Sequence, residues 1–477
     1  MPPRPSLLLV LFLLIILSMP TLNCSLQGPA QGPVTGPVPT SNSHSNSHSN
    51  SHSNARQVAL KILSTSSSTS TKSSSLISSL QSPSDRNLCT NLVQTANRRE
   101  GQIDDIIQRH AKKRPKKVVL AALKLGIVQM KFLDTPPHAA IYETLEALKT
   151  FPSVSKPQVS FVNAVLRSAS NSTSPLSPST SNLSPHISST LSSDWGSSVM
   201  SEVAEVYSLH DGGVTLSCTD VDVVGEMFRT HNVTNEVSPL GSVGVKNPGS
   251  IKKLHGFDEG LWWVQDSSAS LPAILLKNSI ERIKKEGETV RVVDVCSAPG
   301  GKAMQMGSWG WEVEGVELKE KRAKRMRENI ERTRLQNKVT VTVADAKTFQ
   351  PSLPPLGFLL DAPCTATGTG RKNVDVMRRS EAEGKKMEEE LVNTTVGIWE
   401  NAKHWGSKVC VFSVCSLSVR EGESQVDTFL RMGGVEIDRI MPEEVPGFEG
   451  SIDEQGRLRI FPSDRGDGFF ITRFIFV

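Results

Sequence analysis

Two cysteines lie at the carboxyl ends of hydrophobic segments, and these segments resemble neighbouring β-strands. Cys364 follows the segment Phe358-Leu-Leu-Asp-Ala-Pro, and Cys415 lies at the end of 408–416 (KVCVFSVCS). The carboxyl ends of parallel strands share one edge of a sheet, where ligands bind in open α/β folds. Cys410 is an odd number of residues before Cys415 and is predicted to face the core on the opposite side. The alternative is that Cys364 and Cys415 are a chance pair of buried thiols.

A pair of thiols at such an edge is suited to one demanding reaction, the methylation of cytosine at C5. That carbon is a poor nucleophile until a thiolate adds to C6 and makes C5 resemble an enamine carbon. A thiol with a pKa of about 8.5 reaches the thiolate form with modest help, whereas a hydroxyl does not. Asp361, three residues before Cys364, is a candidate hydrogen-bond partner for a cytosine ring or a cofactor.

A glycine-rich turn follows another hydrophobic segment, 292–302 (VVDVCSAPGGK). Gly300 and Gly301 allow close approach of the backbone to a ligand, and the amides that open the next helix can bind a carboxylate or phosphate. The spacing is neither GxGxxG nor GxxxxGK[ST], which disfavours dinucleotides and nucleoside triphosphates. Glu317 ends the next predicted strand, where a carboxylate commonly binds ribose hydroxyls, and Asp345 ends the third. Together they favour a nucleoside cofactor over a coincidence.

The composition is that of a multidomain globular chain diluted by polar stretches. Its 477 residues have room for two to four domains, with 37% apolar residues and a net charge of +4. These values exclude collagen, a coiled coil and a polytopic membrane protein. The seven cysteines are an odd number without a CxxC pair, which argues against a disulfide framework and against a zinc site.

The segment 55–170 has a helical pattern and no strand pattern. We predict a helical bundle there, with a serine-rich loop up to residue 84. The basic run 109–117 is either a solvated loop or a contact for nucleic-acid phosphates. The segment 171–198 is rich in serine, with 14 Ser and no Lys or Arg across 168–198, and is expected to be a flexible linker.

The rest of the sequence, from residue 199 onward, predicts a small α+β subdomain at 199–260 and an α/β domain at 261–477. Apolar strands alternate there with helices, so we expect a Rossmann-like, mostly parallel seven-stranded sheet covered on both faces. The helix predicted after Leu318 is strongly basic, and it is either a solvated surface helix or a track for RNA phosphates. The predicted strands are 290–295, 311–318, 338–344, 357–360, 408–414 and 468–477.

Three motifs give the chain a resemblance to a known family. The segments 294–302, 359–371 (LLDAPCTATGTGR) and 411–424 (VFSVCSLSVREGES) resemble the Nop/Sun family of S-adenosylmethionine-dependent RNA cytosine-C5 methyltransferases. The helical region resembles NusB, through 123–129 (LKLGIVQ) and 161–167 (FVNAVLR). The resemblance implies an all-α NusB-like RNA-binding domain followed by a class I methyltransferase domain, acting on RNA of the small ribosomal subunit.

The resemblance also assigns roles to residues. It makes Cys415 the nucleophile and Cys364 the thiol that assists product release, with no metal. It assigns S-adenosylmethionine contacts to Cys296, Ser297, Ala298, Pro299, Gly300, Gly301, Lys302, Glu317, Asp345 and Asp361. The chain departs from the family pattern at Val414, directly before the nucleophile, and at Ala303, directly after the loop lysine. It departs again at Val419, Arg420 and Gly422, in the stretch that follows the nucleophile. The region 171–254 is shortened relative to the family.

Two other functions compete with this interpretation. A non-catalytic RNA-binding assembly factor would retain the methyltransferase fold only as structure. A DNA cytosine-C5 methyltransferase would use the Pro-Cys cysteine as its nucleophile and would not need Cys415 or a NusB-like domain. We expect RNA rather than DNA as the partner, and a monomer without stable membrane association once the leader has been removed.

The N-terminus predicts targeting. Residues 1–25 combine a basic start with the apolar run 7–17, whose helical rise of about 16 Å is too short for a hydrocarbon core of about 30 Å. The low-complexity segment 26–54 contains no Asp or Glu. A signal-like stretch before an acid-free segment indicates a plastid reached through the secretory route, with plain secretion or another organelle as the alternative.

Overall fold

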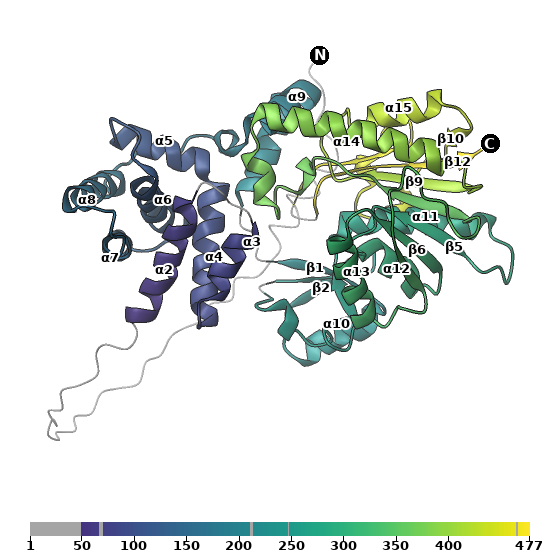
Figure 1. The fold of residues 1–477 in the computed structure, drawn as a ribbon, viewed down its shortest axis with the longest axis horizontal. Helices are drawn as coiled ribbons and strands as arrows, with labels where there is room; N and C mark the ends of the chain where they lie inside the picture. The colour runs from purple at the N-terminus through teal and green to yellow at the C-terminus, as the bar shows by residue number, and fades with distance from the viewer. Residues whose placement is uncertain (1–48, 66–69, 210–212, 247, 464–465) are drawn as a thin grey trace, which may run out of the picture. The chain divides into compact units, whose positions relative to one another are not determined.

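The computed structural model describes residues 49–477 except 66–69, 210–212, 247 and 464–465. The targeting prediction for residues 1–25, and most of the segment 26–54, lie outside the described residues. Among the residues described, no helix is both long and apolar enough to cross a membrane. Figure 1 shows the helical N-terminal elements and the α/β elements that follow them.

The region 55–170 is helical, as predicted. Its central helix, α6, is buried along almost its whole length, and Ala122, Leu125 and Val128 at its middle are inaccessible to solvent. The serine-rich loop expected before residue 84 is wrong in part, because Leu76 and Ile77 of a short helix pack against the bundle core. The helices are α2 (Ser49–Ser64), α3 (Ser70–Ser78), α4 (Pro83–Arg98), α5 (Glu100–His110), α6 (Lys117–Phe132), α7 (Pro137–Lys149) and α8 (Lys156–Ser170).

The flexible linker predicted at 171–198 is also wrong over most of its length. A 3-10 turn, η1 (Ser179–Asn182), leads into the long helix α9 (Pro185–Ser208). Leu183, Ile187 and Leu191 recur every four residues, and the last two share one face of α9. All three are buried in a cluster with side chains of the C-terminal region around Met377. The serine content hides this apolar stripe.

The subdomain predicted at 199–260 is an antiparallel four-stranded sheet with one helix, α10 (Val221–Thr230). Trp262 and Phe228 fill its core. Its strand order is β2-β3-β1-β4, so the last strand lies just beyond the predicted boundary. The strands are β1 (Val214–Cys218), β2 (Asn235–Val237), β3 (Ser242–Val245) and β4 (Trp262–Val264).

The C-terminal region contains the predicted mostly parallel sheet. Seven strands follow the order β10-β12-β9-β8-β5-β6-β7, and an eighth, β11 (Leu458–Ile460), pairs with β12. The five strands from β9 to β7 are parallel, while β12 and β10 are antiparallel. They are β5 (Arg291–Val295), β6 (Glu312–Glu317), β7 (Val339–Val343), β8 (Gly357–Asp361), β9 (Val409–Val414), β10 (Val435–Ile437) and β12 (Phe469–Phe476).

Helices cover both faces of this sheet (Figure 1). On one face α11 (Ser267–Ile283), α12 (Gly301–Ser308) and α13 (Glu320–Arg332) pack over Val292, Leu359 and Val411. On the other face α14 (Glu381–Ala402) and α15 (Glu423–Arg431) pack over the alternate strand residues. Cys410 is fully buried in this second cluster, as predicted from its offset.

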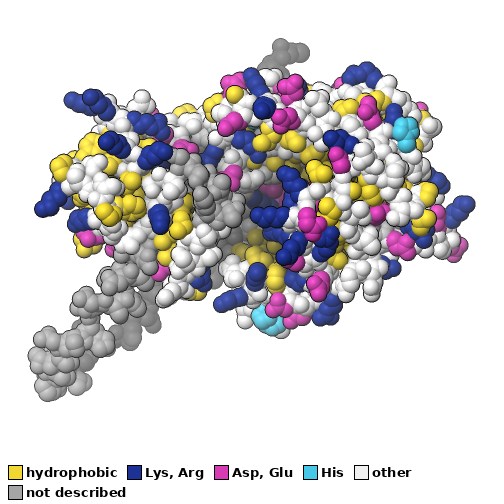
Figure 2. All heavy atoms as spheres, viewed as in Figure 1, with side chains coloured by type: hydrophobic (Ala, Val, Ile, Leu, Met, Phe, Trp, Pro, Cys, Tyr) yellow, Lys and Arg dark blue, Asp and Glu magenta, His cyan; other side chains and the backbone are white. Residues whose placement is uncertain are grey.

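Helix α13 is amphipathic in an unusual way, because its polar face is mainly basic. Ala323, Met326 and Ile330 face the sheet and are buried. Figure 2 shows Lys and Arg side chains, with acidic ones among them, gathered on the part of the surface where α13 lies. The basic helix is therefore exposed, which both a solvated helix and a phosphate-binding helix require.

Candidate active site

The predicted site residues follow the carboxyl ends of five adjacent parallel strands. In the order of the sheet, Cys415 follows β9, Asp361 ends β8, and the loop 296–302 follows β5. Glu317 then ends β6 and Asp345 follows β7. Parallel register places all of these ends at one edge of the sheet, which is where ligands bind in this architecture.

The two cysteines of the predicted pair are in contact. Their sulfur atoms, Cys364 Sγ and Cys415 Sγ, lie 3.5 Å apart, and both residues are partly buried. Hydrogen bonding to Cys415 and burial raise the pKa of the Cys364 thiol well above its ordinary value. Cys364 therefore holds its proton and is the thiol able to donate it to Cys415.

Backbone contact between the two cysteine loops depends on a glycine. The amide of Gly368 donates to the carbonyl oxygen of Cys415 at 2.9 Å. A Cβ at Gly368 would lie 2.2 Å from the carbonyl oxygen of Gly468 and 3.0 Å from that of Cys415. Because no side chain fits there, glycine allows the loop after Cys364 to lie against the loop after Cys415.

A partly buried ion pair lies beside the cysteines. Lys302 Nζ donates to Asp361 Oδ2 at 2.7 Å, and Ser413 Oγ donates to Asp361 Oδ1 at 2.8 Å. Burial lowers the pKa of Lys302, but the charges of Asp361, Asp294 and Cys415 outweigh it and the net shift is upward. Lys302 therefore stays cationic, close enough to Cys415 for their charges to interact.

The loop 296–302 is a tight turn shaped for close approach by a ligand. Cys296 and Gly300 have φ angles of 60° and 97°, and the amide of Gly300 bonds to the carbonyl of Ser297 at 2.8 Å. Burial raises the pKa of Cys296 to about 12, so this thiol stays protonated and is not a nucleophile. Beneath the turn, burial raises the pKa of Asp294 to about 7.

The two acids farther along the edge differ in their surroundings. Glu317 is 2% exposed, accepts the amide of Lys319 at 2.9 Å and pairs with Arg322 at 3.1 Å. Arg322 also bonds to the carbonyl of Ala298, which links Glu317 to the loop. Asp345 bonds within its own turn, to the amide of Lys347 at 3.0 Å. The carboxylate of Glu317 is thus held beside the backbone turn by the shared partner Arg322.

One buried acid beside the cysteines was missed by the sequence reasoning. Glu421 accepts the amide of Thr365 at 2.8 Å and the hydroxyl of the same residue. Burial raises its pKa, against these hydrogen bonds. Thr365 directly follows Cys364, so Glu421 ties the Cys364 loop to the Cys415 loop. The signal was that Glu421 is the acid left in place in a stretch where its neighbours depart from the family pattern.

A second missed cluster joins three distant segments. Asp266 accepts from Arg371 at 3.3 Å, from Lys372 and from the amide of Asp467 at 3.0 Å. Burial raises the pKa of Asp467 to about 6, and the negative charge of Asp266 is the next cause. The cluster fixes the segment after Cys364 against the start of α11 and the segment that leads into β12.

Two family comparisons match the two regions of the chain. Residues 282–475 match the family described as 16S rRNA methyltransferase RsmB/F, and residues 53–171 match the NusB family. The protein named ribosomal RNA small subunit methyltransferase B from Salmonella paratyphi A is 26% identical over 421 residues, covering 82% of this chain and 89% of its own. The protein of the same name from Yersinia enterocolitica is 28% identical over 385 residues, covering 74% and 81%.

Two solved structures share the fold. The crystal structure of PH0851 matches with a TM-score of 0.67 and 17% identity, covering 90% of this chain and 99% of that one. The structure of NSun6 from Pyrococcus horikoshii with SFG matches with a TM-score of 0.51 and 16% identity, covering 61% and 98%. The predicted family resemblance, the predicted cofactor S-adenosylmethionine and the predicted fold, a NusB domain followed by an α/β methyltransferase domain, are confirmed.

Proposed function

We propose, from the combination of a NusB domain with an RsmB/F-type methyltransferase domain in one chain, that this protein methylates cytosine C5 in small-subunit rRNA. The observation that carries the proposal is the contact between Cys364 and Cys415, 3.5 Å apart at the ends of adjacent strands. The names of the Salmonella and Yersinia relatives support rRNA as the substrate.

S-adenosylmethionine, when bound, supplies an electrophilic methyl group for cytosine C5. The residues proposed to hold it are the loop 296–302, Glu317, Asp345 and Asp361. The backbone turn and the carboxylates suit its amino-acid and ribose groups. The positive φ angles at Cys296 and Gly300 support this assignment, because they bring the chain from the end of β5 directly into the first amides of α12.

The chain's own residues perform the remaining steps. Cys415 Sγ adds as a thiolate to C6 of the cytosine, which makes C5 nucleophilic. Cys364 keeps its proton because its pKa is raised, and it can donate a hydrogen bond to the Cys415 thiolate. The cation of Lys302 also favours that thiolate. After C5 has been methylated, its proton passes to a solvent water, the C–H electron pair re-forms the C5–C6 double bond, and the C6–S bond breaks to return Cys415 as a thiolate. Cys364 assists this release through the hydrogen bond that it donates to the departing sulfur.

The competing function is a ribosome-assembly factor that binds RNA without catalysis. Val414 and the shortened region 171–254 favour it, since both depart from the family pattern. The retained contacts among Lys302, Asp361 and the two cysteines count against it. An assembly factor has no need of a cationic lysine beside a pair of thiols.

The cellular location is a separate proposal. We propose that residues 1–54 direct the protein to a plastid through the secretory route. The test is to fuse residues 1–54 to a fluorescent protein and to follow its location in a cell that contains a plastid reached in this way. Secretion of the fusion, or its delivery to another organelle, would contradict the proposal.

The decisive experiment combines the protein from Ala55 onward with labelled S-adenosylmethionine and unmodified small-subunit rRNA. We expect one cytosine to become 5-methylcytosine, and the Cys415→Ala variant to transfer no methyl group. Both free rRNA and partly assembled subunits are to be tested. Cofactor binding without transfer to either substrate would favour the assembly factor.

A further inference from the structure

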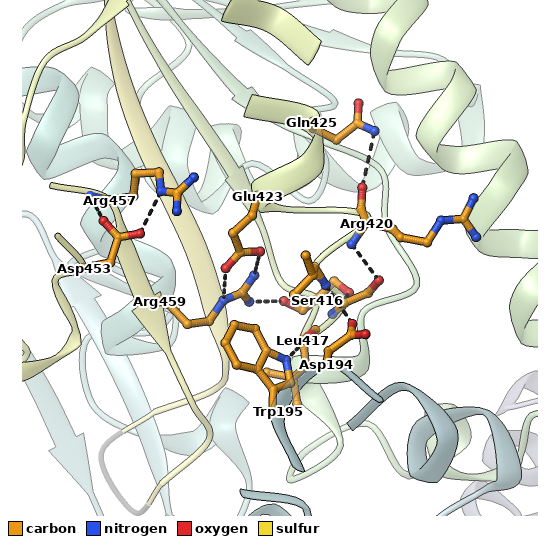
Figure 3. A network of polar contacts seen from close by, with 12 residues as sticks. Asp194, Trp195, Ser416, Leu417, Arg420, Glu423, Gln425, Asp453, Arg457 and Arg459 are labelled. Atoms are coloured by element: carbon orange, nitrogen blue, oxygen red, sulfur yellow. Dashed lines mark hydrogen bonds and ion pairs between the residues drawn. The ribbon is translucent and has the colours of Figure 1, made fainter. Parts of the chain in front are cut away.

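Helix α9 is interrupted beside the loop that follows Cys415. Gly196 has φ 81° and ψ 174°, values that end the first half of the helix. Nothing in the described chain lies within 4 Å of a Cβ built at Gly196, so glycine is needed there for its backbone conformation and not for space. The two residues before the break, Asp194 and Trp195, lie next to the loop (Figure 3).

Both of these side chains bond to the backbone of that loop. Trp195 Nε1 donates to the carbonyl oxygen of Leu417 at 2.7 Å. The amide of Val419 donates to Asp194 Oδ2 at 3.0 Å. Trp195 thus supplies a hydrogen-bond donor and the neighbouring Asp194 supplies an acceptor. Their partners are backbone groups of Leu417 and Val419, two residues apart in the loop.

A third side chain completes this set of contacts. Arg459 donates to the carbonyl oxygen of Ser416 at 2.6 Å and makes two bonds to Glu423, at 3.0 and 2.6 Å. Its guanidinium lies over the ring of Trp195, 5.2 Å from the centroid. Trp195 therefore acts twice, by its own hydrogen bond and by packing against the residue that holds Ser416 (Figure 3).

The loop depends on such contacts because it has no regular structure. Between the end of β9 and the start of α15, residues 415–422 form neither helix nor strand. Side chains bond to the backbone at Ser416, Leu417 and Val419. Cys415 lies at the start of this loop, so the direction of its sulfur depends on how the following residues are held.

We propose that Asp194 and Trp195 are positioning residues for the nucleophile Cys415. This inference rests on the proposed function, since it requires that Cys415 attack C6. Attack needs the sulfur about 3–3.5 Å from the reacting carbon and correctly aligned, and a misplacement of about 1 Å can reduce the rate about a hundredfold. The serine-rich segment before the methyltransferase domain therefore supplies side chains that position the nucleophile through the loop backbone.

The first test is the substitution Trp195→Phe, which keeps an aromatic ring over Arg459 and removes the N–H donor. We expect kcat to fall about tenfold, with unchanged KM values for rRNA and S-adenosylmethionine. The matched control is Trp405→Phe, because Trp405 is buried and its Nε1 has no hydrogen-bond partner among the described residues. Wild-type kcat in Trp195→Phe, or an equal loss in both variants, would overturn the proposal.

The second test uses a pair of substitutions at Asp194. Asp194→Ala removes the acceptor for the Val419 amide and is expected to lower kcat several-fold. Asp194→Asn retains a carbonyl oxygen that can accept the same bond, and it should restore most of kcat. If Asp194→Asn is as slow as Asp194→Ala, the hydrogen bond is not what positions the loop. Absence of methyl transfer by the wild-type protein would instead refute the proposed function.

Discussion

The carboxyl edge of the main sheet and helix α9 both reach the two cysteine loops, but they do so with different kinds of atoms. At the sheet edge, ionisable side chains meet one another, as in the contact of Lys302 with Asp361 and of Cys364 with Cys415. From α9, the side chains of Trp195 and Tyr207 bond to backbone carbonyls. The edge carries the side chains to which the proposed function assigns the chemistry, and α9 contacts the backbone of the loops that present them.

This difference explains why one region is recognisable from the sequence and the other is not. A thiol or a lysine at the end of an apolar strand has few structural uses, so its residue type indicates chemistry. A tryptophan that binds a backbone carbonyl leaves no matching signature, because every residue supplies that carbonyl.

After the complete loss expected for Cys415→Ala, the largest expected effect is that of Cys364→Ala. If Cys364 assists release, this variant should form the bond between Cys415 and C6 but turn over at less than about one hundredth of the wild-type rate. A covalent RNA–protein complex should accumulate and be visible on a denaturing gel. The double variant Cys364→Ala/Cys415→Ala is the control and should show no complex. Loss of activity without a complex, together with an active Cys415→Ala variant, would reverse the roles.

Lys302→Met tests the charge at the same edge. Removing the cation leaves Asp361 without its ion-pair partner and the Cys415 thiolate without a nearby positive charge. We expect kcat to fall about a hundredfold, as for the loss of a buried electrostatic group. Lys385→Met on α14 is the control, since Lys385 is exposed and pairs with Glu381 within its own helix. A Lys302→Met variant with nearly wild-type kcat would show that this charge has no catalytic role.

Tyr207→Phe tests α9 with a smaller change. The Tyr207 hydroxyl is fully buried and donates to the carbonyl of Thr367, in the loop after Cys364. Its loss removes that buried hydrogen bond, which should lower the free energy of unfolding by about 1–2 kcal/mol and speed hydrogen exchange at residues 365–369. The only other tyrosine, Tyr142, is 63% exposed, so Tyr142→Phe is the control. Equal exchange in both variants would contradict the role.

The fold was predictable where apolar patterns are long. The central strands β5, β8 and β9 bury nearly all of their mostly apolar residues, and the helices of the NusB domain bury apolar residues at helical spacing; both patterns can be read from the sequence. The strands β10 and β11 were missed because each has three residues, too few for a period to appear. Helix α9 was missed because serine outnumbers the leucine and isoleucine residues that recur every four positions.

The candidate site was predictable where its residues lie at the ends of predicted strands. Strand ends located the cysteines, the loop 296–302 and Glu317, because the register of parallel strands converts sequence position into spatial position. Glu421 and Asp194 were not found as contacts of the loops, since each meets a backbone amide from a distant part of the chain. Long-range pairing of this kind depends on tertiary packing, which has no local pattern.

The smallest expected effect concerns Asp294, which lies at the edge but is fully buried beneath the loop. Its pKa is raised by burial from 3.8 to about 7, so the folded protein binds a proton that the unfolded chain releases near pH 4. Stability is therefore lost as the pH rises toward and through 7, and the loss between pH 6 and pH 8 is about 1 kcal/mol. Asp294→Asn cannot titrate, so the free energy of unfolding of the wild type should fall relative to this variant over that range. Asp375→Asn, at an exposed position, is the control and should keep the wild-type pH dependence. The opposite outcome is that the free energies of unfolding of wild type and Asp294→Asn differ by the same amount at every pH from 6 to 8. That result would mean that Asp294 is ionised throughout this range and is stabilised as a charge, like the acids at the open edge.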